Sequence, residues 1–198
     1  EDFQAGTEGL ALAEARGIGV IAMEPLRGGG LAARVPPQVA AIWERAPRRR
    51  SPAQWALRWV WNHTGIVTAL SGMNAPEQLD DNLAAAEQAA PGALTSAELA
   101  LVSQVREFYR SRTPAACTSC GYCMPCPHGV AIPDVLAAYI GGVMFETKAG
   151  TGYYRAQLVR NGKGGDSCTE CGECEPKCPH AVPIIEKLRE AHSFFTSP

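Results

Sequence analysis

The chain has 198 residues and a formal net charge of −2, enough for one or two domains with a sizeable core. Residues 1–112 carry 11 Arg against 12 acidic residues, and residues 113–198 carry 7 Lys and Arg against 8, so neither part has the basic excess of a nucleic-acid or anionic-membrane binder. No apolar run reaches the ~18 residues of a membrane span, and the start lacks signal-peptide character, so we expect a protein with no nucleic-acid or membrane partner.

The first elements alternate between helix and strand. Residues 7–17 are predicted to form a helix that ends at Gly17. The apolar run over 17–23 predicts a buried parallel strand, and the proline and glycines of residues 25–30 predict a loop after it. A short helix is expected over 37–46.

A second helix–strand–helix stretch follows. Ser51 and Pro52 form a helix start, with a hydroxyl N-cap before a proline at the first helical position, and this helix should end near Asn62. Residues 66–70 predict a second buried strand. The pairs Asn74 with Glu77 and Thr95 with Glu98 each predict a capping box at the start of a further helix.

This order is typical of an α/β protein with a parallel sheet. Because two strands cannot cover the faces and edges of such a sheet, we expect residues 1–112 to be the tail end of a larger α/β domain. A second domain is expected over residues 113–198.

All eight cysteines of the chain lie in this second part, in two blocks. The first block reads Cys-x2-Cys-x2-Cys-x2-Cys-Pro and the second reads Cys-x2-Cys-x2-Cys-x3-Cys-Pro. The second has the spacing of the bacterial run that ligates iron–sulfur clusters, so we predict [4Fe-4S] clusters. The predicted ligands are Cys117, Cys120, Cys123, Cys126, Cys168, Cys171, Cys174 and Cys178.

In two-cluster proteins the fourth cysteine of each run ligates the other cluster, which predicts crossed ligand sets. One cluster would take Cys178 together with the first three cysteines of the first block, and the other would take Cys126. The first block has x2 in place of x3 before Cys126, so a single cluster remains an alternative to two. Gly121 and Gly172 are expected where the loop backbone passes close to a cluster.

Other readings of eight cysteines are a pair of structural zinc sites or four disulfides. Zinc pairs usually have two CxxC units with a longer spacer, and disulfide scaffolds spread their cysteines through a small chain. The clustering here favours a reducing, cytoplasmic compartment. His128 and His180 follow the two Cys-Pro pairs, and we expect them at helix starts or beside the ligands.

Both blocks run into apolar helical patterns, and residues 134–160 between them are also predicted to be helical, with interruptions at Gly141–Gly142 and Gly150. Helices inserted between two such motifs resemble the alpha-helical ferredoxin arrangement of electron-transfer subunits.

The first part resembles the aldo/keto reductases. Residues 17–31, Gly-Ile-Gly-Val-Ile-Ala-Met-Glu-Pro-Leu-Arg-Gly-Gly-Gly-Leu, look like the family's seventh strand and the loop after it. The segments 53–60, 66–73 and 78–82 look like its last helix–strand–helix stretch. The resemblance implies α/β plus α: the C-terminal part of a (β/α)8 TIM barrel, then a mostly helical dicluster ferredoxin-like domain.

Barrel active sites lie at the C-terminal ends of the strands, so the resemblance implies that the loops after Met23 and Leu70 face NAD(P) in the full-length protein. Two groups of residues are implied to border the diphosphate and the adenosine end, in that order: Pro25, Leu26 and Gly28, then Gly72, Met73, Gln78, Asp81 and Asn82.

The chain departs from this family in several places. A lysine and an arginine that hold the 2′-phosphate in many members are matched by Gly72 and Gln78, and the nicotinamide-stacking tyrosine by Met23. The family's catalytic tyrosine, lysine, aspartate and histidine belong to the first half of the barrel. Residues 1–112 contain no Lys and one Tyr, Tyr109, so we assign no catalytic residue.

The resemblance implies an iron–sulfur oxidoreductase of the aldo/keto reductase type, seen as its C-terminal portion and not catalytic as this chain alone. Its partner would be an electron-transfer protein or a small carbonyl substrate. The alternatives are a ferredoxin-like electron carrier and a cluster-stabilised interaction module without reductase activity.

Overall fold

The computed structural model describes residues 6–197. The chain divides into two compact units, Glu1–Phe108 and Tyr109–Pro198, which we call the N-terminal unit and the C-terminal unit. The division falls inside helix α6 (Ser96–Ser111), whereas the boundary expected from the sequence follows that helix. No helix in the described part of the chain is long and apolar enough to cross a membrane.

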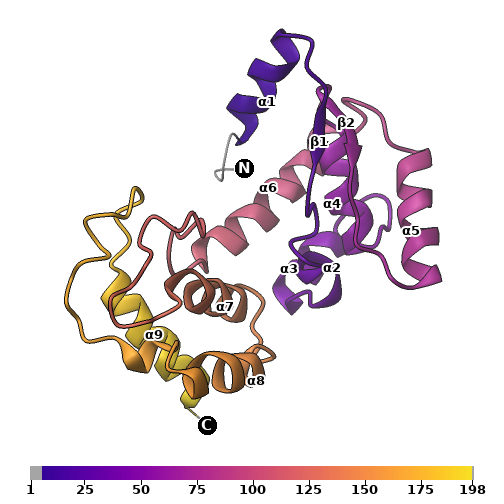
Figure 1. Cartoon of the computed structure of the whole chain (residues 1–198). Helices are drawn as coiled ribbons and strands as arrows, with labels where there is room; N and C mark the ends of the chain where they lie inside the picture. The colour runs from indigo at the N-terminus through magenta and orange to yellow at the C-terminus, as the bar shows by residue number, and fades with distance from the viewer. Residues whose placement is uncertain (1–5, 198) are drawn as a thin grey trace. The chain divides into compact units, whose positions relative to one another are not determined.

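The N-terminal unit follows the predicted order of helices and strands (Figure 1). Its elements before α6 are α1 (Gly6–Ala15), β1 (Val20–Ala22), α2 (Gly30–Ala33), α3 (Pro37–Glu44), α4 (Pro52–Trp61), β2 (Ile66–Ala69) and α5 (Pro76–Glu87).

Helix α1 ends at Ala15, and Gly17 caps its C-terminus as predicted. Gly17 has a φ of 68°, in the left-handed region that glycine adopts without a steric penalty. Its N–H donates to the Glu14 carbonyl, and the Ile18 N–H donates back to the Ala13 carbonyl. These two bonds form a Schellman motif, which stops the helix and directs the chain into β1.

Strands β1 and β2 pair in parallel, in the register Val20 to Ile66 and Ala22 to Ala69. The predicted burial of both strands is wrong, because Ile21 is 55% and Val67 is 67% exposed. Among the described residues the sheet has these two strands alone, so its outer edges and much of its faces are uncovered. A short continuous run of apolar residues predicts a strand, but burial of that strand depends on neighbouring elements.

Helix α4 anchors the core of the N-terminal unit. The Ser51 hydroxyl accepts from the Gln54 N–H at 3.0 Å, and Pro52 occupies the first turn, as predicted. Trp55 is buried and stacks on Trp43 with ring centroids 4.6 Å apart. The guanidinium of Arg50 lies over the Trp55 ring, 4.4 Å from its centroid. Helices α3 and α4 are thereby joined by aromatic packing.

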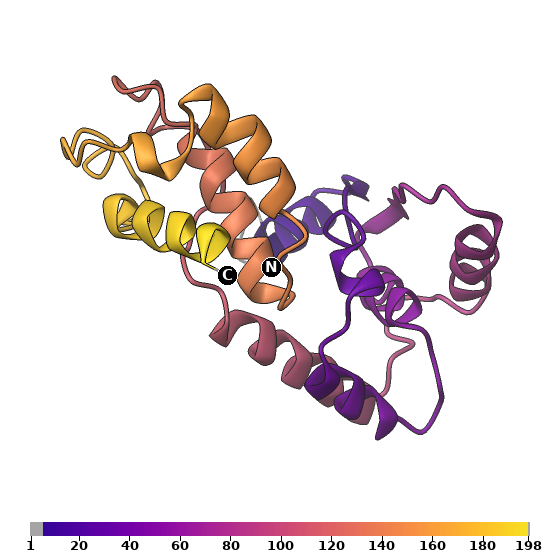
Figure 2. The same ribbon diagram turned by 90° about the horizontal axis from the view of Figure 1, so that it is seen from below.

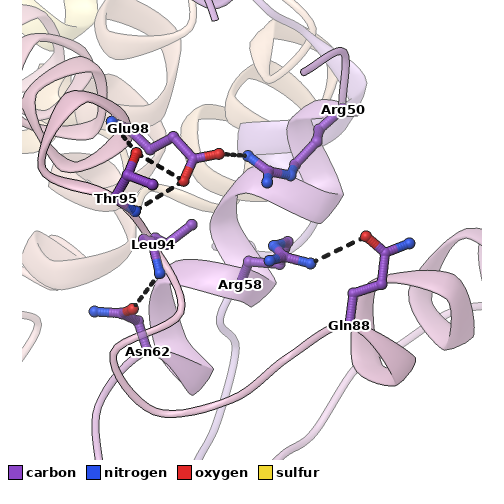
Figure 3. Close-up of polar contacts among 7 residues, drawn as sticks. All are labelled: Arg50, Arg58, Asn62, Gln88, Leu94, Thr95 and Glu98. Carbon is purple, nitrogen blue, oxygen red and sulfur yellow. Dashed lines mark hydrogen bonds and ion pairs between the residues drawn. The ribbon is translucent and has the colours of Figure 1, made fainter. Parts of the chain in front are cut away.

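Glu98 forms a capping box with Thr95 at the start of α6, as predicted (Figure 3). The Thr95 N–H donates to Glu98 Oε2 at 2.9 Å, and the Glu98 N–H donates to Thr95 Oγ1 at 3.2 Å. Arg50 donates to the other carboxylate oxygen at 2.5 Å. Burial of Glu98 raises its pKa, but the hydrogen bonds from Thr95 and Arg50 outweigh this, so the pKa lies below its ordinary value.

The predicted cap at Asn74 is wrong. Helix α5 has Ala75 at its N-cap and Pro76 in its first turn, and no side chain caps it. Proline at the first helical position fixes the start one residue later than the Asn74 pattern requires. The Asn74 N–H instead donates to the side-chain oxygen of Gln78 at 3.0 Å.

The C-terminal unit is mainly helical. Helices α7 (Ile132–Met144) and α9 (Ile184–Thr196) lie side by side, and both views show them adjacent (Figures 1 and 2). Between them are α8 (Thr151–Tyr153), a π-helical turn over Tyr154–Leu158 and two 3₁₀ turns, Val159–Asn161 and Gly165–Ser167. The largest fully buried side chains of this core are Val130, Ile132, Val135, Leu136, Tyr154, Ile184, Leu188 and Phe195.

The predicted interruption at Gly141–Gly142 is wrong, because α7 continues through both glycines. A Cβ at Gly142 would lie 2.6 Å from Cε1 of Phe194 on α9, whereas one at Gly141 would have nothing within 4 Å. Gly142 is therefore the position at which α9 packs closely on α7. The predicted break at Gly150 is present, at the start of α8.

Candidate metal centre

The two cysteine blocks fold into loops with the same backbone. Ser119 and Glu170, at corresponding positions, have φ of 54° and 59°. Gly121 and Gly172 have φ of 80° and 79°, and a Cβ at either would meet nothing within 4 Å. Both glycines therefore have left-handed backbone, which glycine adopts without a steric penalty. The sequence repeat is a structural repeat.

The repeat continues past the fourth cysteine of each loop. The Gly129 N–H donates to the Cys126 carbonyl at 3.0 Å, and the Ala181 N–H donates to the Cys178 carbonyl at 3.1 Å. Helices α7 and α9 start three residues beyond these turns. The two histidines after the Cys-Pro pairs lie in the turns before these helices, so of the two positions expected for them, at a helix start or beside the ligands, the structure does not show the first.

One cavity, which we call site A, is lined by the first three cysteines of the first loop and the last cysteine of the second. It encloses about 330 Å³, part of it open to solvent. Its thiols belong to Cys117, Cys120, Cys123 and Cys178.

A second cavity, site B, encloses about 360 Å³ and has the complementary set of thiols. These belong to Cys126, Cys168, Cys171 and Cys174, and Cys123 also borders this cavity. The apolar walls come from both halves of the repeat: Val182 and Ile184 line site A together with Leu136, and Val130 and Ile132 line site B together with Leu188. Each site is therefore formed by both loops and by the helices behind them.

All eight cysteines are free thiols, so none is paired in a disulfide. Burial raises the pKa of the Cys117, Cys123 and Cys174 thiols above the ordinary value. The pKa of Cys120, which faces solvent, is lowered by the backbone N–H of Tyr122. Each cavity therefore combines half-buried thiols with one exposed thiol.

The donor set of each cavity fits a [4Fe-4S] cluster. Such a cluster takes four thiolates, and each cavity has four cysteines available when Cys123 is assigned to site A, with apolar side chains behind them. Among residues 6–197, no three His, Cys, Asp or Glu side chains are close enough to hold a single metal ion.

One contact at site A was not foreseen from the sequence. Thr118 Oγ1 in the first loop lies 3.1 Å from Nε2 of His180 in the second, within hydrogen-bond distance. Spacing alone gives no signal for this pair, because its members are 62 residues apart. His180 also lines site A, which agrees with the expectation that it lies beside the ligands.

The residues implied to bind a nucleotide lie in the N-terminal unit. Because β1 and β2 are parallel, the loops that follow them leave the same edge of the sheet, and the Leu70 N–H donates to the Ala22 carbonyl at 2.8 Å. Pro25, Leu26 and Gly28 belong to the first of these loops, and Gly72 and Met73 to the second. The structure thus brings both loops to one edge.

The three remaining nucleotide candidates lie on α5. Asn82 is buried and its side-chain amide donates to Ser71 Oγ at 3.0 Å and to Met73 Sδ at 3.2 Å. Asp81 accepts from the side chains of Ser51 and Gln54, so it ties α5 to α4. Gln78 bonds to the loop backbone. Asn82 and Gln78 therefore shape the loop after β2, while Asp81 joins two helices.

Two protein-family models match separate stretches of the chain. A model of the aldo/keto reductase family matches residues 4–105, more than half of the chain. The chain belongs to the aldo/keto reductase family. In this aldo/keto reductase, a model of a 4Fe-4S dicluster domain matches residues 116–183, which include all eight cysteines. Neither a search of curated proteins nor one of solved structures returned a significant match.

Proposed function

We propose that this chain is an iron–sulfur oxidoreductase of the aldo/keto reductase type in which sites A and B each hold one [4Fe-4S] cluster for electron transfer. The two family matches support the oxidoreductase and the iron–sulfur domain. The observation that carries the rest is that the eight cysteines divide into two sets of four around two neighbouring cavities, with Cys123 bordering both. Bound there, a cluster would accept and release one electron at a time.

The crossed ligand sets give the two sites a shared dependence. Cys178 reaches site A from the second loop, and Cys126 reaches site B from the first. Neither site is complete unless both loops and the helices behind them are folded. We therefore expect cluster binding and folding of the C-terminal unit to be coupled.

The direct test is the iron, acid-labile sulfide and zinc content of the protein purified without oxygen. Two cubane clusters predict about eight iron and eight sulfide per chain, with the broad absorption and reduced-state EPR signal of such clusters. About four iron would leave one site, and zinc without sulfide would overturn the proposal in favour of structural metal sites.

For the N-terminal unit we propose a contribution to NAD(P) binding by the two loops at the edge of the sheet and by α5. The residues are those assigned above from the resemblance. Residues 1–112 contain no Lys and one Tyr, so the family's catalytic set cannot be assembled from them. We therefore do not expect this chain alone to reduce carbonyl compounds.

The electron count favours a protein partner for the clusters. A nicotinamide cofactor transfers two electrons as a hydride, and a cubane cluster takes one, so transfer between them needs a converter such as a flavin. The absence of a flavin motif from the sequence supports an electron-transfer protein as the partner. The second candidate, a ferredoxin-like carrier without reductase activity, is favoured if the clusters exchange electrons with a partner protein and the chain binds no nicotinamide nucleotide.

A further inference from the structure

Sites A and B form a matched pair. Their loops have the same backbone conformation at the corresponding residues, and their cavities have similar volumes of about 330 and 360 Å³. The exposed thiols Cys120 and Cys171 correspond, and the other three thiols of each site are half-buried. Protein fold and solvent access therefore do not distinguish the two sites.

Charge does distinguish them. The first loop, residues 117–126, has no charged side chain, whereas the second loop, residues 168–178, has three carboxylates and one ammonium group. Three uncharged residues of the first loop, Ser119, Tyr122 and Met124, are replaced at the corresponding positions by Glu170, Glu173 and Glu175.

The surrounding contacts reduce this difference but do not remove it. Arg189 of α9 forms an ion pair with Glu170 at 2.6 Å, which offsets one carboxylate. Lys177 lines site B together with Glu173. The Glu175 carboxylate accepts the Ile185 N–H at 3.1 Å, at the start of α9. With Arg189 counted, the second loop keeps one negative charge that the first loop lacks.

Charges at the helix starts do not upset this balance. Asp134 on α7 and Glu186 on α9 occupy corresponding positions after the two loops, so each site has one acid there. Lys187 lies on α9 next to Glu186, but it forms ion pairs with Glu186 and Glu190.

A nearby carboxylate makes an added electron less favourable, because it repels the extra negative charge. We propose, on the basis of the function proposed above, that the acidic side chains of the second loop make site B harder to reduce than site A. A single electron added to the C-terminal unit then resides at site A. Electron transfer within the unit runs from site B to site A: one electron leaves site B, and the same electron arrives at site A.

The test is an EPR-monitored redox titration of the full chain with dithionite, in the wild type and in two variants. Glu173→Gln removes a charge at site B, and Tyr122→Glu adds one at the corresponding position of site A. Tyr122 is 66% exposed and Glu173 is exposed, so both positions tolerate the change. If Tyr122→Glu loses iron, Ser119→Glu replaces it, since Glu170 adopts the same backbone conformation.

We expect two one-electron midpoint potentials in the wild type. The equilibrium constants for reduction of the two sites should differ at least tenfold, which corresponds to a separation of about 59 mV between the potentials. Glu173→Gln should raise the lower potential, and Tyr122→Glu should lower the higher one, so both variants narrow the gap. A gap that widens in either variant would mean that site B is reduced first. Indistinguishable potentials in the wild type would also overturn the inference.

Iron and sulfide are measured on the same samples before the titration. About four iron or fewer would overturn the two-cluster function and this inference together. About eight iron with a widened gap, or with equal potentials, would overturn the inference alone and leave the proposed function standing.

Discussion

The two units differ in how they cover their apolar side chains. In the N-terminal unit, Ile18, Ile21 and Val67 on or beside the strands are each more than half exposed. In the C-terminal unit, Val130, Val135 and their neighbours have almost no exposed surface. The C-terminal unit contains two copies of a loop followed by a helix, and the apolar side chains of each copy are buried against the other copy. A parallel strand needs neighbours on both sides, and β1 and β2 have each other.

The largest expected effect tests the exchange between loops on which the C-terminal unit depends. Cys178→Ser should remove the cluster of site A and leave about four iron per chain, although Cys178 belongs to the second loop. Adding Cys120→Ser should cost no further iron, because it alters the same site. Adding Cys171→Ser instead should remove the second cluster and leave almost none. Iron and sulfide analysis of the three proteins is the measurement.

If each cluster took all four ligands from one loop, the iron contents of the two double variants would be reversed. Cys178 and Cys171 would then serve one cluster, and the Cys178→Ser, Cys171→Ser protein would keep about four iron. The comparison of the two double variants therefore separates the arrangements without any assumption about spectra. Cys126→Ser in place of Cys178→Ser provides the complementary experiment at site B.

The next effect concerns the polar cluster that holds the N-terminal unit together. Glu98→Ala removes the acceptor of the Thr95 N–H, the Thr95 hydroxyl and Arg50, and it leaves Arg50 largely buried without this partner. We expect a loss of about 3 kcal/mol in the free energy of unfolding of that unit. Hydrogen exchange resolved by unit measures it, and the C-terminal unit should keep its protection.

Glu107→Ala is the matched control, since Glu107 lies on the same helix and is exposed. It should change the free energy of unfolding by less than about 0.5 kcal/mol. An equal cost for both variants would show that Glu98 acts only through its helix position and not through the contacts shown in Figure 3.

A smaller effect is expected where α7 and α9 meet. Gly142→Ala would place a methyl group 2.6 Å from a ring carbon of Phe194 and should destabilise the C-terminal unit by about 1–3 kcal/mol. Gly141→Ala meets nothing within 4 Å, so it should be neutral or stabilise the helix by up to about 1 kcal/mol. Denaturant unfolding of both variants is the measurement, and equal stabilities would argue against close packing at Gly142.

These cases show which features the sequence predicts. The Ser51 cap and the box of Thr95 with Glu98 were predicted correctly, because their partners lie within three residues along the chain. The continuation of α7 through Gly142 was not, because the reason is the ring of Phe194 fifty-two residues later. Hydrogen bonds between residues close in the sequence can be predicted from the residue types, but packing between distant helices cannot.

The candidate metal centre shows the same contrast between features that the sequence predicts and contacts between distant residues that it does not. The grouping of thiols around two cavities matches the crossed pattern expected from the spacing, since a repeat reveals long-range correspondence in the sequence itself. The ligands remain a prediction until iron is measured. The contact of Thr118 with His180 and the exposure of the strand residues had no such signal, because each depends on which elements meet in space.

A pH dependence is expected from Glu98. Its pKa in the folded chain is lowered, so its stabilising effect is present above the ordinary pKa of about 4.3 and is lost as the pH falls through the lower, folded value. Glu98→Gln should therefore cost stability at pH 6, and the difference from the wild type should shrink towards pH 3. A difference that stays constant over this range, measured by denaturant unfolding, would show that the charge of Glu98 does not contribute.

The smallest expected effect tests the exposed strands directly. Val67→Thr replaces a methyl group by a hydroxyl on a side chain that is 67% exposed, so the free energy of unfolding should change by less than about 0.5 kcal/mol. The same change at Val135, which is 0% exposed, should cost about 1–3 kcal/mol, because the hydroxyl is buried among apolar side chains. The two variants share their chemistry and differ in burial alone. If both variants lost the same free energy of unfolding, another surface would cover β2 in solution. The difference in burial between the two units would then hold for the isolated chain but not for its assembled form.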